Sequence, residues 1–367
     1  MHRRAIVGTA LLVGCSAPDA GRDAGPPAPV WTVAPEPLFV AGGDADAEPL
    51  FRIAGAVRID NGYLIANASA GEVRLYGDDG NLIRTIGQEG SGPGEFLAPR
   101  LAGRTGGDSV VVADDANRRV AIICDGERVC DEWALPAAGN PIGIVGDRVI
   151  LGEIVLDMST DGVSYDRHRF FKAERHGIAL DTLFELDSTP RIARRIDGRL
   201  ISTPLPFSRP GSMTLVREGI AITNGSNASI LVVDTTGAVA ADIQLPIDVI
   251  DVSREEFDAE IERRLGTMEG PRREAFAEFY SDMPRLESRT PIQRILADRL
   301  GLIWVELEGT GAVQEWLVVD AVGGVHARVS TPADLLVTEI GEDYVVGLWR
   351  DEMEVEFVHA YRLERID

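Results

Sequence analysis

The sequence predicts an all-β fold built from repeated four-stranded units, and three observations support this prediction. After residue 50, short runs rich in β-branched and aromatic residues alternate with turns of Gly, Asp and Asn. This pattern recurs about every 40 residues, a spacing typical of repeat folds. Apolar residues make up 45% of the 367 residues, so the chain can build a hydrophobic core.

Six such units follow one another along the chain. The first has strands at 57–59, 63–67, 73–76 and 82–86, with a turn at 60–62 between the first two. The second has strands at 110–114, 120–124 and 129–135. The others span residues 142–184, 212–245, 292–329 and 335–363. The third and sixth units depart furthest from the shared pattern.

The last unit supplies only three strands, at 335–340, 344–349 and 355–363. Residues 31–40 also have the pattern of a strand, although they precede the first complete unit. We therefore predict that this N-terminal segment forms the fourth strand of the last unit. The pairing would join the two ends of the chain and cover a sheet edge that otherwise favours aggregation.

One segment, residues 253–287, interrupts the β pattern. Ser253 and Glu256 have the spacing of a capping box, and Phe257, Ile261 and Leu265 follow on one helical face. Gly270-Pro271 then begins a second helix. We predict a helical hairpin inserted between the fourth and fifth units, either packed on the rim of the fold or closing over a site.

The N-terminus has the features of an export signal. A cationic stretch at 1–4 precedes ten apolar residues at 5–14, too few to span a bilayer permanently. Leu12-Val13-Gly14-Cys15 resembles the lipobox of bacterial lipoproteins. The resemblance implies that residues 1–14 are removed, that Cys15 carries lipid, and that Ser16 directs the protein to the outer membrane. The alternative is an ordinary cleaved signal with a chance cysteine.

Residues 15–30 are rich in Pro, Gly and small side chains, which predicts a flexible tether. The membrane would then be contacted through the lipid anchor alone. The formal charge of −23 repels phosphate backbones, which excludes nucleic acid as a partner.

The two remaining cysteines, Cys124 and Cys130, flank an Asp-Gly turn between two short strands. Such a turn brings the flanking side chains together, and the predicted export favours oxidation. We predict a disulfide between them, with two free thiols as the alternative.

Two stretches carry a resemblance to a known family. Residues 112–120, with Asp114, Asn117 and Arg119, resemble the core of an NHL repeat. The connector 87–96 contains Gly-Pro-Gly-Glu-Phe and resembles the connectors of bacterial six-bladed β-propeller lipoproteins. The resemblance implies that residues 31–367 form a six-bladed β-propeller that binds a ligand or a protein.

The polar positions of this motif recur only in part. Asn67 and Asn224 occupy the position of Asp114, and Asn227 occupies that of Asn117. Asp and Asn at such turns also cap the backbone, so a purely structural role is the alternative.

The sequence offers little catalytic chemistry. The histidines show no short metal-ligand spacing, and the acidic run 44–48 lacks the EF-hand pattern. We therefore predict no cofactor and no metal site, leaving a divalent ion in the central channel as an open alternative. Trp304, Trp316 and Trp349 lie in strand patterns and are expected in the core rather than on a sugar-binding surface.

These observations favour a lipid-anchored envelope protein that binds an unknown protein or small molecule and catalyses nothing. The alternative is a metal-dependent hydrolase or lyase of the gluconolactonase-like type, which shares the fold. A third interpretation is a structural component of an outer-membrane assembly.

Chain direction predicts which end of the fold binds. The connector 87–96, the insert 253–287, the turns 114–119 and 224–227 and the segment 156–167 should share one end, with the 124–130 hairpin at the other. We expect docking at the first end, with Arg119 and Arg209 as anion contacts.

Overall fold

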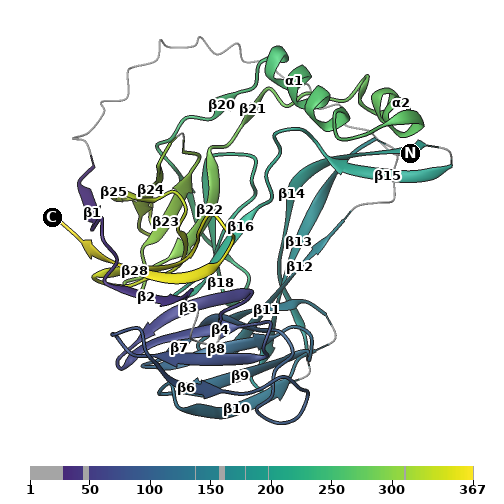
Figure 1. Cartoon of the computed structure of the whole chain (residues 1–367). Coiled ribbons are helices and arrows are strands. Elements are labelled where there is room, and N and C mark those ends of the chain that lie inside the picture. The colour runs from purple at the N-terminus through teal and green to yellow at the C-terminus, as the bar shows by residue number, and fades with distance from the viewer. Residues whose placement is uncertain are drawn as a thin grey trace, which may run out of the picture.

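A computed structural model describes residues 28–43, 49–136, 138–156, 162–177, 179–196, 198–309 and 311–366. The predicted signal, Cys15, the tether up to residue 27 and the acidic run 44–48 lie outside the described residues. The described chain is all-β with two short helices, as the sequence predicts (Figure 1).

Antiparallel strands form the successive units. The first contains β3 (Ile53–Ile59), β4 (Gly62–Asn67), β5 (Glu72–Tyr76) and β6 (Leu82–Ile86). The second contains β7 (Pro99–Gly106), β8 (Ser109–Asp114), β9 (Arg119–Cys124) and β10 (Arg128–Ala134). The fourth contains β16 (Ser212–Val216), β17 (Gly219–Thr223), β18 (Ser229–Asp234) and β19 (Val239–Gln244).

The fifth unit contains β22 (Ile292–Ala297), β23 (Ile303–Leu307), β24 (Val313–Val319) and β25 (Val325–Pro332). The sixth contains β26 (Leu336–Ile340), β27 (Tyr344–Arg350) and β28 (Glu356–Glu364). The first strand of the second unit, β7, was not among the predicted strands.

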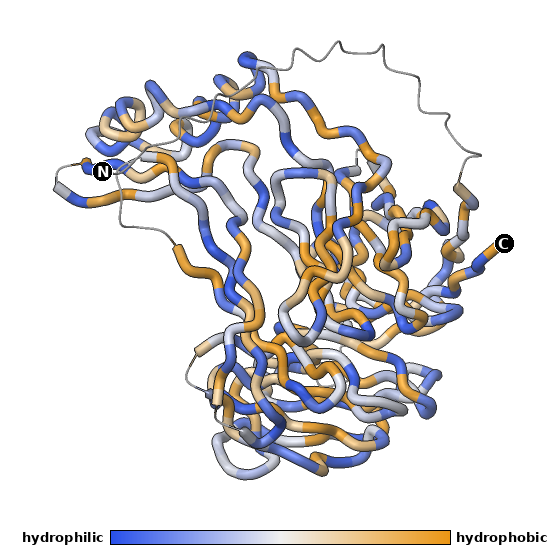
Figure 2. Tube along the Cα trace, turned by 180° about the vertical axis from the view of Figure 1, so that it is seen from behind, coloured by the Kyte–Doolittle hydropathy of each residue, from blue (hydrophilic) through white to orange (hydrophobic). Residues whose placement is uncertain are grey.

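The first strands of the units contact one another in a closed ring. β3 contacts β7, and contacts continue through the third and fourth units to β22, then to β26, which returns to β3. Separate hydrophobic clusters fill the spaces between neighbouring units, and Figure 2 shows apolar stretches along the strands. Trp304 and Trp316 are fully buried in these clusters, as expected. The arrangement is β-propeller-like.

The N-terminal segment joins the C-terminal unit, which confirms the predicted pairing, but it does so as two strands. β2 (Phe39–Gly42) pairs antiparallel with β28. β1 (Val30–Val33) pairs antiparallel with the last residues of β28 and parallel with β25 of the fifth unit. The chain start therefore closes the sixth sheet and also ties it to the fifth.

The third unit is larger than predicted. It contains β11 (Asn140–Val145), β12 (Arg148–Val155), β13 (Gly162–Glu174), β14 (Asp181–Ile196) and β15 (Arg199–Pro204), so it ends at residue 204 rather than 184. Residues 162–167, expected in a long loop, belong to β13. The alternating pattern of β13 and β14 continues beyond the ring, and the two strands form an arm (Figure 1).

The helical insert packs on this arm. α1 (Arg254–Leu265) begins with the predicted capping box, in which Ser253 and Glu256 cap each other's backbone amides. α2 (Gly270–Tyr280) follows, and the short pair β20 (Ile250–Asp251) and β21 (Ser288–Arg289) closes the base of the insert. A cluster including Phe257, Phe279 and Ile192 joins both helices to β14 and β15. The helices thus pack on the arm of the third unit rather than on the rim of the ring.

Two names are used below for the ends of the ring. The insert end is where residues 87–98 and 245–291 connect successive units, and the disulfide end is opposite. Cys124 and Cys130 are bonded, with Cα atoms 5.9 Å apart, which confirms the predicted disulfide. A Cβ added at Gly126 in that hairpin would lie 2.4 Å from Cδ1 of Ile59, so the hairpin packs at the end of β3. No helix of the described chain is long and apolar enough to cross a membrane.

The ring closure makes a testable prediction at Trp31. Its side chain is 8% exposed, its ring centroid lies 6.0 Å from that of Trp304, and its indole N–H donates to the Ile366 carbonyl. Trp31→Ala should lower the free energy of unfolding by about 3 kcal/mol, because it opens a cavity between the fifth and sixth units. Urea denaturation measures this change.

The matched control is Val30→Ala, since Val30 lies in the same strand but is 64% exposed. Its effect should stay within about 0.5 kcal/mol. Equal stability of both variants would show that β1 does not hold the ring together.

Candidate functional site

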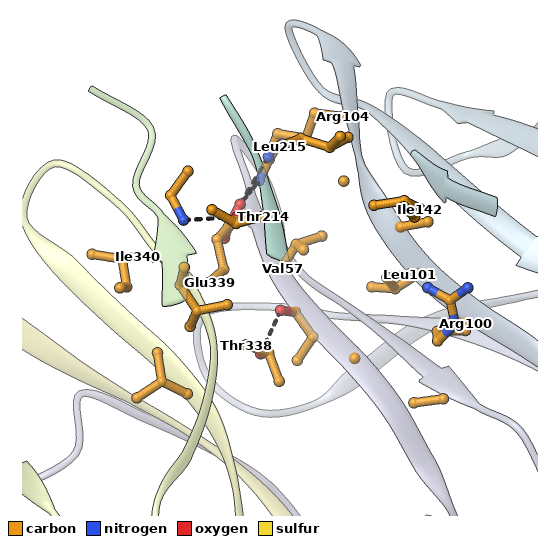
Figure 3. Close-up of a pocket in the computed structure, with 18 of the residues that line it drawn as sticks. Val57, Arg100, Leu101, Arg104, Ile142, Thr214, Leu215, Thr338, Glu339 and Ile340 are labelled. Carbon is orange, nitrogen blue, oxygen red and sulfur yellow. Dashed lines mark hydrogen bonds and ion pairs between the residues drawn. The ribbon is translucent and has the colours of Figure 1, made fainter. Parts of the chain in front are cut away.

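The ring of first strands encloses a cavity of about 650 Å³ (Figure 3). Its lining comes from β3, β7, β11, β16, β22 and β26, so every unit contributes. This volume falls in the range of small-molecule sites. The cavity is therefore the first candidate for a binding site.

Backbone irregularities place the lining side chains. Register shifts interrupt β3, β7, β11, β22 and β26 where they border the cavity. A bulge turns the following side chain out of the regular alternation. Arg104, Arg294 and Glu339 each follow directly on such a shift. Gly143 lies in another at φ 156°, where an added Cβ would approach the Ala102 carbonyl to 2.4 Å.

Most of the wall is apolar. Its larger apolar side chains include Ile142, Ile144, Met213, Leu215, Leu296 and Val337. Charge enters through four arginines and two carboxylates. These are Arg100, Arg104, Arg294, Arg299, Asp298 and Glu339.

Glu339 and Arg104 form an ion pair across the end of β3, at the disulfide end. Nε of Arg104 donates to Oε1 of Glu339 at 2.8 Å, and the same guanidinium donates to the Arg58 carbonyl. The other carboxylate oxygen accepts the Arg58 amide at 2.7 Å and the Tyr344 hydroxyl at 2.9 Å. Burial raises the pKa of Tyr344. Glu339 therefore has a full set of donors within the chain.

Asp298 is also fully engaged. Its side chain has no exposed surface, and Oδ2 accepts from Trp304 at 3.0 Å and from Arg365 at 2.9 Å. Arg294 pairs with Glu306 and donates to the Val337 carbonyl at 2.7 Å. These groups hold the wall together.

Arg100 and Arg299 are less fully engaged. Arg100 donates to the Pro141 carbonyl at 2.7 Å and lies 3.6 Å from the Asp115 carboxylate, with both side chains more than a third exposed. Arg299 donates only to the Tyr344 hydroxyl, at 3.4 Å, and forms no ion pair with a carboxylate of the described chain. Both guanidinium groups keep donors available.

The polar side chains of the NHL-like motif form hydrogen bonds with backbone groups of the chain. Asp114 is fully buried, and its two oxygens accept the amides of Leu97, Ala98 and Asn117 at 3.1–3.2 Å. Asn117 donates to Asp114 and to the Gly90 carbonyl. Arg119 donates to the carbonyls of the connector, including that of Gly92 at 2.8 Å. Together these side chains fasten the connector 87–96 to the second unit.

The other predicted site residues are also engaged at the insert end. Asn224 caps its own turn by accepting the amides of Ser226 and Asn227, and Asn227 accepts from Ser229. Arg209 donates at 2.6 Å to Gln293 and at 2.6 Å to Glu308. Burial lowers the pKa of Arg209. Residues 114, 117 and 119 form one cluster, but the structure does not gather all six candidates into one site.

A buried polar cluster lies at the base of the arm. Asp166, His168 and Ser188 are 5%, 2% and 1% exposed, and each has a side-chain atom without a hydrogen-bond partner among the described residues. Burial raises the pKa of Asp166 and lowers that of His168. A Cβ added at Gly211 would lie 3.3 Å from Cε1 of His168, so the fourth unit covers the cluster. The cluster is therefore buried between the third and fourth units.

Within the described residues, no three or more His, Cys, Asp and Glu side chains are grouped so that they could hold a metal ion.

The comparisons with known proteins concern the fold alone. No protein-family model matches the sequence, and no curated protein matches it. A member of the DUF4221 family from Bacteroides vulgatus aligns with a TM-score of 0.53 and 10% identity, over 91% of this chain and 98% of that chain. A Bacteroides fragilis protein provisionally described as exported aligns with a TM-score of 0.51 and 13% identity, over 90% of this chain and 95% of that chain.

The sequence analysis missed the charged residues of the cavity. Arg104 and Glu339 are 235 positions apart, and each follows a bulge that breaks the two-residue period. Only one weak sequence feature could have identified these residues. It is a charged residue in the first strand of a unit, at a position where an apolar side chain would be expected.

The fastening role of Asp114 is testable. Asp114→Ala should lower the free energy of unfolding by about 3 kcal/mol, because several buried amides lose their acceptor. Hydrogen exchange should accelerate at the Leu97 and Ala98 amides, and Asp114→Asn should be intermediate. Asp147→Ala, at a side chain 83% exposed, is the control and should change neither quantity. Unchanged protection at residues 97 and 98 would contradict the assignment.

Proposed function

We propose that the protein is an exported, lipid-anchored six-bladed β-propeller that binds a ligand in its central cavity and catalyses no reaction. The observation that carries this proposal is the cavity itself, which borders the first strand of every unit. The closed ring of strand contacts supports the blade count. A rigid ring with a lined cavity needs no rearrangement to receive a small molecule.

The use of the carboxylates supports binding rather than catalysis. A general base needs a lone pair directed at the substrate. Glu339 and Asp298 direct theirs at Arg104, Tyr344, Trp304 and Arg365 instead. The two carboxylates of the wall thus serve to position neighbouring side chains.

The insert end is where we propose that a ligand enters or a protein docks. The arm and the two helices project from this end, and Arg209 lies near the base of the insert, where Glu308 also pairs with Arg289. The helices rest on β14 and β15 through their own hydrophobic cluster. They therefore form a wall beside the entrance, and Arg119, Arg209 and the asparagine turns form its surroundings.

The lipid anchor is tested at Cys15. Radiolabelled palmitate should enter the wild type and not Cys15→Ser, because the sulfur of residue 15 would be the atom to which the lipid group is attached. The double variant Cys124→Ser/Cys130→Ser is the control, and its labelling should equal that of the wild type. Equal labelling of Cys15→Ser would end the proposal of a lipoprotein.

The cavity is tested with N-phenyl-1-naphthylamine, a neutral dye that fluoresces in apolar surroundings. Leu336 lines the cavity at the start of β26 and is 54% exposed, so Leu336→Trp should narrow the mouth without disturbing the core. We expect saturable dye binding to the wild type and about tenfold weaker binding to the variant, equivalent to about 1.4 kcal/mol.

Leu82→Trp is the matched control, because Leu82 is 46% exposed on the outer strand β6. Its dye affinity should equal that of the wild type. The same affinity in all three proteins would show that the dye binds elsewhere and would remove the support for a cavity site.

A further inference from the structure

We propose that the ligand of the central cavity is an organic anion with an apolar body. This inference rests on the proposed function and names the class of molecule that the same site would take. Two observations lead to it: the sign of the charge that lines the cavity, and the two arginines whose donors the chain leaves available.

The residues that line the cavity have a net charge of opposite sign to that of the whole chain. The chain carries a formal charge of −23, yet four arginines and only two carboxylates line the cavity. Arginines therefore outnumber carboxylates among the residues that line the cavity. Charge of one sign inside a low-dielectric cleft focuses the field and raises the local concentration of counter-ions.

The pairing within the wall shows which arginines can bind. Arg104 is neutralised by Glu339, and Arg294 by Glu306. Asp298 lines the cavity but directs Oδ2 at Trp304 and Arg365, so it forms no ion pair with either of the remaining two arginines.

Arg100 and Arg299 carry the surplus positive charge. Arg299 is exposed and has no carboxylate within ion-pair distance among the described residues, so Glu339 and Asp108 act on it only at longer range. The Arg100–Asp115 contact is 3.6 Å long and more than a third exposed, so water screens it and it contributes little. An anionic group could accept charge-assisted hydrogen bonds from either guanidinium, each typically worth tenfold or more in affinity.

The two arginines lie toward opposite ends of the cavity. β7 starts at the insert end, so Arg100, its second residue, lies near that end. Arg299 lies two residues after the end of β22, at the disulfide end. Between them the wall is mostly apolar, with Ile142, Leu215 and Leu296 facing one space. A bare inorganic anion would leave this apolar surface uncovered. An anion with an apolar body satisfies both parts of the site.

Two dyes of one skeleton test the inference on the full mature protein. 1-Anilinonaphthalene-8-sulfonate is N-phenyl-1-naphthylamine with an added sulfonate, so their affinity ratio isolates the anionic group. We expect the sulfonate dye to bind at least about tenfold more tightly to the wild type. Added salt should weaken the sulfonate dye alone, since it screens only the charged contact.

Substitutions locate the anion contact. A single sulfonate reaches only one of two arginines that lie toward opposite ends. One of the variants Arg100→Gln and Arg299→Gln should therefore lower the affinity for the sulfonate dye about tenfold, and both should leave that for the neutral dye unchanged. Arg100→Lys and Arg299→Lys keep the charge and should retain most of the preference. Arg148→Gln is the control, because it removes one arginine that does not line the cavity, at the start of β12, where Arg148 pairs with Glu174. Melting curves confirm that each variant is folded.

The outcomes separate the two proposals. If Leu336→Trp weakens the neutral dye but the sulfonate gains nothing, the cavity is a ligand site and the anion inference is wrong. If both dyes are insensitive to Leu336→Trp, the cavity proposal fails and the anion inference fails with it. If Arg148→Gln lowers the sulfonate affinity as much as the more affected of the two cavity variants, net charge alone explains the preference, which also overturns the inference.

Discussion

The pairing of the chain start with β28 is the constraint on which the rest of the structure depends. β2 contributes Phe39 and Ala41 to the hydrophobic cluster between the sixth and first units, and β1 contributes Trp31 to the cluster between the fifth and sixth. Each cluster needs walls on both sides, so the closing strands complete two of them at once. β26 of the closed unit contacts β3, and both strands line the cavity.

The features that were predicted correctly are those encoded by short-range sequence motifs. Asp-Gly and Asn-Gly turns, the Ser253 capping box and the Cys124–Cys130 spacing each act over a few residues, and the structure contains all of them. β7 was missed because Gly103 and Gly106, both at positive φ, remove its alternating pattern. The arm was missed because nothing local marks where a strand leaves the ring. Its end is set by the helices that pack on it.

The single NHL-like match reflects architecture more than recognition. Asp114 and Asn67 occupy the same place in neighbouring units, and both accept amides of the chain entering that unit. A carboxylate can accept more such bonds than an amide oxygen, and the second unit presents more donors because its connector 87–98 is folded back on itself. Asn224 caps only its own turn. The residue at this position thus varies with the conformation of the connector that enters the unit. A unit without the motif loses no side chain that lines the cavity.

The charges of the molecule are distributed in a way that follows from this architecture. Bulges in the first strands place long arginine side chains along a narrow space, and carboxylates that would cancel them all are not available there. Glu339 neutralises one arginine, and the buried carboxylate of Asp298 is used to hold Trp304 and the C-terminal Arg365. The acidic exterior repels extended polyanions over a distance of about a Debye length, roughly 10 Å, whereas a small anion that reaches the mouth meets the arginines at contact. On the proposed function, the closed ring would select a ligand by size and the arginines of the wall would select it by charge.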